Sequence, residues 1–155
     1  MKIINGNILS EITECHTKRI IVCQQVNCRG AMGAGLAKQI RAMFPNIYPT
    51  YKTYCNKHGA NLLGLVYLYN IPKTRNIIAN LFGQDGYGRD KCYTNYDALR
   101  ECFRRLRRFT ASTYTIRIPY GIGCGLAGGD WNIITQIIKE ELIKYNCDVE
   151  LYKLK

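Results

Sequence analysis

Two short glycine-rich segments hold the residues best suited to contact a ligand: residues 27–36, called loop 1, and residues 121–129, called loop 2. They contain eight of the 14 glycines of the chain. Glycine allows positive φ and close approach of the backbone, so that successive N–H groups can surround a phosphate. Each loop follows a run rich in β-branched residues and precedes a helical pattern, which adds a helix N-terminus facing the anion. We expect the loops to form one phosphate-binding site.

The same glycines would also serve two tight turns between a strand and a helix. For either loop alone this structural role explains the glycines equally well, and the presence of both loops favours the site. No G-x-G-x-x-G is followed at the right distance by a ribose-binding acid, and no G-K-[ST] is present. A dehydrogenase and a P-loop kinase are therefore disfavoured.

Two polar side chains at the loops are candidates for catalysis. Asn27 stands where a strand pattern ends, and its amide offers a donor and an acceptor to ribose hydroxyls. Its alternative role is an Asx turn before a glycine. Asp130 follows loop 2, where a carboxylate can deprotonate a water or, alternatively, cap the next helix. Asp90 and Cys124 are secondary candidates. For Cys124 the reason is that a loop beside a helix start can lower the pKa of a thiol.

Strand and helix patterns alternate along the chain. One helix presents Leu36, Ile40 and Met43 on a single face, and another begins at a capping box, residues 94–97. This alternation predicts an α/β sheet with helices on both faces and a site beyond the carboxyl ends of the strands. We predict strands at residues 2–5, 20–26, 64–69, 76–82, 113–118 and 147–152, and helices at residues 35–44, 48–57, 94–109 and 131–145.

Composition limits the class of protein. A length of 155 residues with 47% apolar residues predicts one domain with a packed core. No apolar run reaches the roughly 20 residues of a membrane span, and the N-terminus lacks a signal-peptide pattern, so we expect a cytoplasmic protein. Eight dispersed cysteines without C-x-x-C predict reduced thiols and no metal site. The formal net charge of +11 indicates an anionic partner.

The loops and their flanking residues resemble the two signature loops of macro domains. The resemblance lies in QVNCRGAMGAGLA (25–37) and IPYGIGCGLAGGDW (118–131). IANLFGQ (78–84) and YGRD (87–90) match a small phage and bacterial branch associated with ADP-ribose 1″-phosphate processing. The resemblance covers nearly the whole chain. It implies a single macro domain over residues 1–155, folded as a three-layer α/β/α sandwich with a mixed central sheet and needing no cofactor.

The resemblance also implies how ADP-ribose lies in the cleft. Adenine would lie near Asn7 and Ile8, the diphosphate between the loops, and the distal ribose against Asn27. Phe82 would pack on a ribose or base, with a core position as its alternative role. The implied ligand-binding residues are Asn7, Ile8, Asn27, Gly30, Met32, Gly33, Ala34, Gly35, Leu36, Phe82, Gly83, Gln84, Gly121, Ile122, Gly123, Cys124, Gly125 and Leu126.

Four positions depart from the residues that members of the family carry. Asn7 stands where many macro domains have an adenine-binding Asp, and Gln24 stands where relatives of this branch often have His. Gln24 cannot act as a base or nucleophile. In macro-domain glycohydrolases that use a lysine–aspartate pair, the resemblance puts this pair near Gln84 and Ala127, so that mechanism is disfavoured here.

Several functions remain open. The leading hypothesis is hydrolysis of ADP-ribose 1″-phosphate to ADP-ribose and phosphate, with Asn27 and Asp130 in the catalytic roles. The alternatives are a non-catalytic module for free or macromolecule-linked ADP-ribose, and a de-ADP-ribosylating hydrolase without the Lys/Asp pair. We expect a monomer. Nucleic-acid binding through the basic run ranks last, since a solvated helix face also explains that run, which comprises Arg100, Arg104, Arg105, Arg107 and Arg108.

Overall fold

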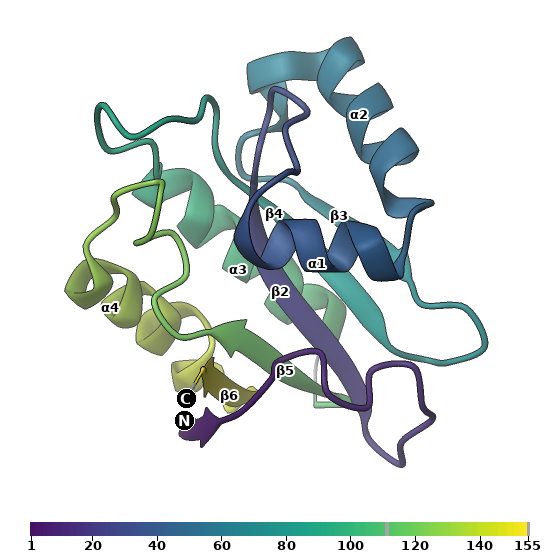
Figure 1. Cartoon of the computed structure of the whole chain (residues 1–155). Helices are drawn as coiled ribbons and strands as arrows, with labels where there is room; N and C mark the ends of the chain where they lie inside the picture. The colour runs from purple at the N-terminus through teal and green to yellow at the C-terminus, as the bar shows by residue number, and fades with distance from the viewer. Residues whose placement is uncertain (111, 155) are drawn as a thin grey trace.

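A six-stranded sheet lies between two pairs of helices in the computed structural model, which describes residues 1–110 and 112–154 (Figure 1). The strand order is β1-β6-β5-β2-β4-β3, and every neighbouring pair is parallel except β3 and β4. The mixed α/β sandwich is therefore confirmed. The strands are β1 (Lys2–Asn5), β2 (Arg19–Asn27), β3 (Val66–Asn70), β4 (Ile77–Gln84), β5 (Tyr114–Pro119) and β6 (Asp148–Lys153), and the helices α1 (Gly35–Met43), α2 (Ile47–His58), α3 (Tyr96–Thr110) and α4 (Trp131–Glu141).

The central strand β2 is apolar on both sides because helices cover both faces of the sheet. Ile20 and Val22 belong to one buried cluster, which continues into α1 and α2. Ile21 and Cys23 point the opposite way, into a cluster completed by α3 and α4. Figure 1 shows these two layers of helices on either side of the sheet.

The parallel strands bring their carboxyl ends to one edge of the sheet. There β2 leads through loop 1 into α1, and β5 leads through loop 2 into α4. Between β4 and α3 runs a third connection, residues 85–93, named loop 3 here. Both glycine loops thus lie beyond the carboxyl ends of adjacent strands, as the sequence predicted.

Two details of the helices differ from the sequence-based expectation. Met43 is 43% exposed, and Phe44 is buried in its place, with its ring 5.8 Å from that of Tyr69. Phe44 lies just beyond α1, where the chain leaves the helical path and the 3.6-residue period no longer applies. The last helix ends at Glu141, and a short 3₁₀ turn, Ile143–Tyr145, replaces its predicted final turn.

The predicted capping box at the start of α3 is wrong in its capping residue. Asn95 Oδ1 accepts from the N–H of Ala98 at 3.0 Å, which makes Asn95 the cap. Thr94 instead donates its hydroxyl to the carbonyl of Gly123 in loop 2, 2.7 Å away. A tertiary partner therefore takes the side chain that the local pattern assigned to the helix.

All eight cysteines are free thiols, and four of them are buried: Cys23, Cys28, Cys55 and Cys102. No helix within the described ranges has both the length and the apolar character needed to cross a membrane.

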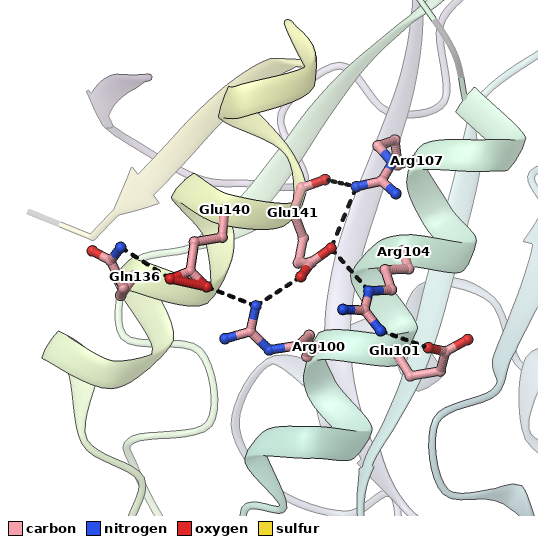
Figure 2. A network of polar contacts seen from close by, with 7 residues as sticks. All are labelled: Arg100, Glu101, Arg104, Arg107, Gln136, Glu140 and Glu141. Atoms are coloured by element: carbon pink, nitrogen blue, oxygen red, sulfur yellow. Dashed lines mark hydrogen bonds and ion pairs between the residues drawn. The ribbon is translucent and has the colours of Figure 1, made fainter.

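Three arginines of the basic run of α3 form an ion-pair network with α4 (Figure 2), whereas Arg105 and Arg108 are exposed, so the prediction of a solvated face is corrected only in part. Arg100 lies 2.7 Å from both Glu140 and Glu141, and Arg104 lies 3.1 Å from Glu141. Arg107 donates to the carboxylate and to the main-chain carbonyl of Glu141. The Glu141 side chain is only 7% exposed. Its burial raises its pKa, but the hydrogen bonds from Arg100 and Arg104 outweigh that effect and leave the pKa below its usual value.

Replacing Glu141 by Gln should lower the free energy of unfolding by about 3 kcal/mol, because it leaves a cluster of guanidinium groups without their shared partner. Because the native pKa of Glu141 is depressed, its charge stabilises the fold fully above the usual carboxyl pKa. That contribution is lost as the pH falls through the native pKa, so the stabilities of wild type and variant should converge.

Urea unfolding between about pH 7 and about pH 3 measures this difference. Glu101→Gln is the control, since the Glu101 side chain is itself 36% exposed and its ion pair with Arg105 at the surface should contribute about 0.5 kcal/mol. A loss that stays constant on acidification would mean that Glu141 acts through packing and not through its charge.

Candidate functional site

A cleft of about 580 Å³ opens between loop 1 and loop 2 at the carboxyl edge of the sheet, a volume typical of small-molecule sites. Its lining comes from β2, β4 and β5 and from all three loops. The predicted site residues that line it are Asn27, Gly33, Ala34, Gly35, Leu36, Gln84, Gly121, Ile122, Gly123, Gly125 and Leu126. Further lining residues are Gln24, Gln25, Val26, Ala31, Ala37, Tyr87, Gly88, Arg89, Pro119 and Ala127.

Asn27 organises loop 1. Its Oδ1 accepts from the N–H groups of Arg29 and Ala31 at 3.0 and 3.2 Å, and its Nδ2 donates to the carbonyl of Ala31 at 2.7 Å. The buried Tyr51 of α2 donates its hydroxyl to the main-chain carbonyl of Asn27 at 2.7 Å. The Asx-turn role is thus present, and one amide hydrogen of Asn27 remains for a ligand in the cleft.

Gln25 connects β2 to the other two walls of the cleft. Its Nε2 donates to Gln84 Oε1 at the end of β4 and to Thr94 Oγ1 directly after loop 3, both at 2.9 Å. The Thr94 hydroxyl passes the chain of hydrogen bonds on to Gly123 in loop 2. The sequence signal for this role was a glutamine pair, Gln24 and Gln25, within an otherwise apolar strand.

Two glycines are required by the closeness of Gln25. A Cβ on Gly83 would lie 2.5 Å from Gln25 Oε1, and one on Gly123 would lie 3.0 Å from the same atom. Gly123 also has a φ of +74°, which side-chain-bearing residues rarely adopt. At these positions glycine therefore lets the walls of the cleft close around one side chain.

The N-termini of α1 and α4 differ. Ala34 precedes α1 without a side-chain cap, no acidic residue occupies the first turn, and Gly35 and Leu36 line the cleft. In contrast, Asp130 Oδ1 accepts from the N–H of Asn132 at 2.8 Å and so occupies the start of α4. The positive end of the α1 dipole is thus open to a ligand anion, whereas a protein carboxylate already neutralises that of α4.

Cys124 does not have the lowered pKa that its loop setting suggested. Burial raises the pKa of this thiol, and the nearby Asp130 and Cys92 raise it further. Its Sγ donates to the carbonyl of Ile122 at 3.5 Å. Cys124 is therefore a protonated, loop-filling side chain at neutral pH.

Other predicted residues lie outside the cleft lining. Met32 and Phe82 are 2% and 1% exposed and belong to the core, where Phe82 stacks on Tyr51. Asn7 Oδ1 accepts from the N–H of Leu9 and shapes the turn after β1. The remaining predicted residues outside the lining are Ile8, Gly30, Gly83, Cys124 and Asp130.

The cleft carries groups for binding and few for chemistry. Within the described part of the chain, Arg89 is the one charged residue of the lining, and no carboxylate, imidazole or thiol joins it. Gln24, where a base was considered, is buried and donates its Nε2 to Asn80 Oδ1 at 2.7 Å. The predicted catalytic carboxylate, Asp130, is exposed, follows loop 2 and is not part of the lining.

A second group of ionisable side chains lies away from the cleft. Glu11, Glu14 and His16 bring ligand atoms within 4.8 Å of one another, with both glutamates exposed. Exposed acidic groups commonly cluster in this way without binding an ion.

Comparison with known proteins gives a consistent assignment of the fold. No family model matches the chain. Over 100 residues it is 32% identical to the ADP-ribose 1″-phosphate phosphatase of Meyerozyma guilliermondii, a stretch that covers 57% of this chain and 55% of that protein. The chain thus matches about half the length of this relative.

Solved structures match over the whole chain. A Bacteroides thetaiotaomicron protein superimposes with a TM-score of 0.85 at 28% identity, covering 98% of both chains. A macrodomain protein from Streptomyces coelicolor gives 0.79 at 21% identity, covering 98% of this chain and 97% of its own. DarTG of Thermosipho africanus, solved in complex with ADP-ribose, gives 0.73 at 19% identity over 99% of this chain and 41% of its own.

Gly83→Ala should destabilise the protein by about 2 kcal/mol, because the added Cβ meets Gln25 Oε1. The double variant with Gln25→Ala should lose less than the sum of the two single changes, since the obstructing side chain is gone. Gly125→Ala is the control: no heavy atom lies within 4 Å of its added Cβ, and the cost should stay below about 0.5 kcal/mol. Urea unfolding measures all four variants, and strict additivity would contradict the contact.

Proposed function

Since this chain is a macro domain by fold, we propose that its cleft binds ADP-ribose, with the diphosphate between loop 1 and loop 2. The observation that carries the proposal is the uncapped N-terminus of α1, whose first residues line the cleft. Backbone N–H groups at such a terminus bind phosphate oxygens without a side chain. The relative solved in complex with ADP-ribose supports the choice of ligand.

The strand order supports one direction for the ligand. From β1 the carboxyl edge passes through β6, β5 and β2 to β4. Asn7 follows β1 at one end of this edge, and loop 3 follows β4 at the other. With adenine toward Asn7 and the diphosphate at the central loops, the distal ribose points toward Gln84 and loop 3.

Hydrolysis of ADP-ribose 1″-phosphate is the second candidate function, favoured by the similarity to the Meyerozyma guilliermondii phosphatase. Loop N–H groups and the α1 terminus would stabilise charge on the phosphate. The lining supplies no general base, so the water would be activated by Asp130 at the end of loop 2 or by the substrate's own phosphate. More groups of the cleft therefore support binding of the ligand than support its hydrolysis.

Gly33→Glu tests the binding proposal. Gly33 lines the cleft, and no heavy atom lies within 4 Å of a Cβ added there, so the fold should tolerate the change. The new carboxylate should weaken ADP-ribose binding at least about tenfold by repelling the diphosphate. Isothermal titration calorimetry measures the affinity, with Thr53→Glu on the exposed surface of α2 as the control of equal charge. Equal affinities for the two variants would refute the placement of the diphosphate.

Asp130→Asn tests the turnover proposal, because Asn caps a helix as well as Asp but cannot take a proton. If Asp130 activates water, phosphate release from ADP-ribose 1″-phosphate should fall by about 100-fold with stability unchanged. Unchanged release by Asp130→Asn would restrict Asp130 to its capping role.

Asn27→Ala should reduce phosphate release and also stability, because loop 1 loses its organising side chain.

A further inference from the structure

We propose that Arg89 binds an anionic group carried by the distal ribose and makes the cleft prefer ADP-ribose 1″-phosphate over ADP-ribose. The inference rests on the proposed binding of ADP-ribose and adds a specificity residue to it. It follows from the position, rigidity and charge of loop 3.

Loop 3 is closed at its base and held at both sides. Gln84 and Thr94 pair as an antiparallel bridge, and Asn95 N–H donates to the carbonyl of Gly83 at 2.7 Å. On one side Cys28 N–H donates to the carbonyl of Asp85 at 2.9 Å, which ties the loop to loop 1. On the other side Tyr93 N–H donates to the carbonyl of Ala127 in loop 2 at 2.7 Å. A nine-residue loop with joined ends is a compact Ω-loop fixed to both walls of the cleft.

The interior of loop 3 is filled by Tyr93. A Cβ on Gly86 would lie 3.2 Å from the Tyr93 ring, and one on Gly88 would lie 3.2 Å from its hydroxyl oxygen. The Tyr93 hydroxyl donates to Asp90 Oδ1 at 2.6 Å, and this hydrogen bond lowers the pKa of Asp90. The loop therefore presents its tip, Tyr87 to Arg89, to the cleft from a packed base.

Arg89 is left without a carboxylate partner among the described residues. The two acids of loop 3 are engaged elsewhere: Asp85 by a two-point contact with Arg29 at 3.1 and 3.0 Å, and Asp90 by Tyr93. Arg89 is exposed and lines the cleft as its one charged residue. A guanidinium that is exposed and has no carboxylate partner can bind two oxygens of a phosphate at once.

The position of Arg89 selects which phosphate it meets. Loop 3 follows β4, at the end of the carboxyl edge opposite Asn7. The α1 terminus and the glycine loops already serve the diphosphate at the centre. Arg89 thus lies where a group on the distal ribose would project. A phosphate there would supply the negative partner for the guanidinium.

The experiment compares the affinities of the intact protein for ADP-ribose and for ADP-ribose 1″-phosphate. The readout is Kd, or KM where phosphate is released. Wild type should prefer the phosphorylated ligand, and Arg89→Gln should reduce this preference about tenfold while its affinity for ADP-ribose changes less than about threefold. Arg89→Lys should keep part of the preference, since it retains the charge without the two-point geometry. Lys91→Gln is the matched control, because Lys91 belongs to the same loop but lies outside the cleft lining.

The possible outcomes distinguish failure of this inference from failure of the proposed binding of ADP-ribose. An unchanged preference in Arg89→Gln, or equal weakening of both ligands, would overturn the inference and leave ADP-ribose binding intact. Equal loss of preference in Lys91→Gln would reduce the effect to net charge and would overturn it as well. Failure of the wild-type protein to bind either ligand would refute the proposed function itself.

Discussion

The cleft depends on the hydrogen bonds of one half-buried side chain, the amide of Gln25. This side chain leaves β2 and reaches both Gln84 and Thr94, and Thr94 continues to Gly123. Three segments far apart in the sequence are thereby fixed to one strand. The walls cannot separate without losing these bonds, and a Cβ on Gly83 or Gly123 would press on the Gln25 side chain that makes them. The protein obtains a rigid site from backbone segments that have few side chains of their own.

A rigid frame of main-chain donors explains why recognition and chemistry separate in this molecule. Loop 1 uses the oxygen of Asn27 for its own turn, and the start of α1 remains open to an anion. At loop 2 the arrangement is reversed, since Asp130 already satisfies the start of α4. One helix terminus can therefore bind ligand charge while the other holds a carboxylate that would repel it. The diphosphate should consequently lie closer to loop 1 than to loop 2.

Local patterns predicted the strands, the helices and both loops, because these features depend on neighbours in sequence. The apolar, β-branched start of β2 and the glycines after it were sufficient to predict a loop at the carboxyl edge, where the cleft lies. Where tertiary contacts compete, the local pattern failed: Thr94 bonds to loop 2 and leaves the capping of α3 to Asn95. Phe44 is buried for a similar reason, since it lies beyond the helix whose period was used to predict Met43.

The site residues that sequence reasoning missed are those whose roles depend on long-range closure. Gln25 becomes central only when residues 84, 94 and 123 meet around it, and no spacing along the chain indicates that meeting. The same holds for loop 3, whose ends are joined through a bridge between β4 and the start of α3. The sequence of loop 3 resembled the family, but it gave no physical reason to select Arg89 as a site residue.

The net charge of the chain says less about its ligand than the positions of individual arginines do. The chain has 22 basic and 11 acidic residues, and this excess alone indicated an anionic partner without saying which. In the structure, Glu141 gathers three arginines of the densest basic run, so this run mainly joins α3 to α4. Among the described residues the cleft arginine, Arg89, has no carboxylate partner, since Asp85 and Asp90 are engaged elsewhere, and we propose that it has more bearing on ligand choice than the whole run. On this proposal a phosphate is recognised by the position of one unpaired charge, and the net charge of the chain serves mainly to attract anions from a distance.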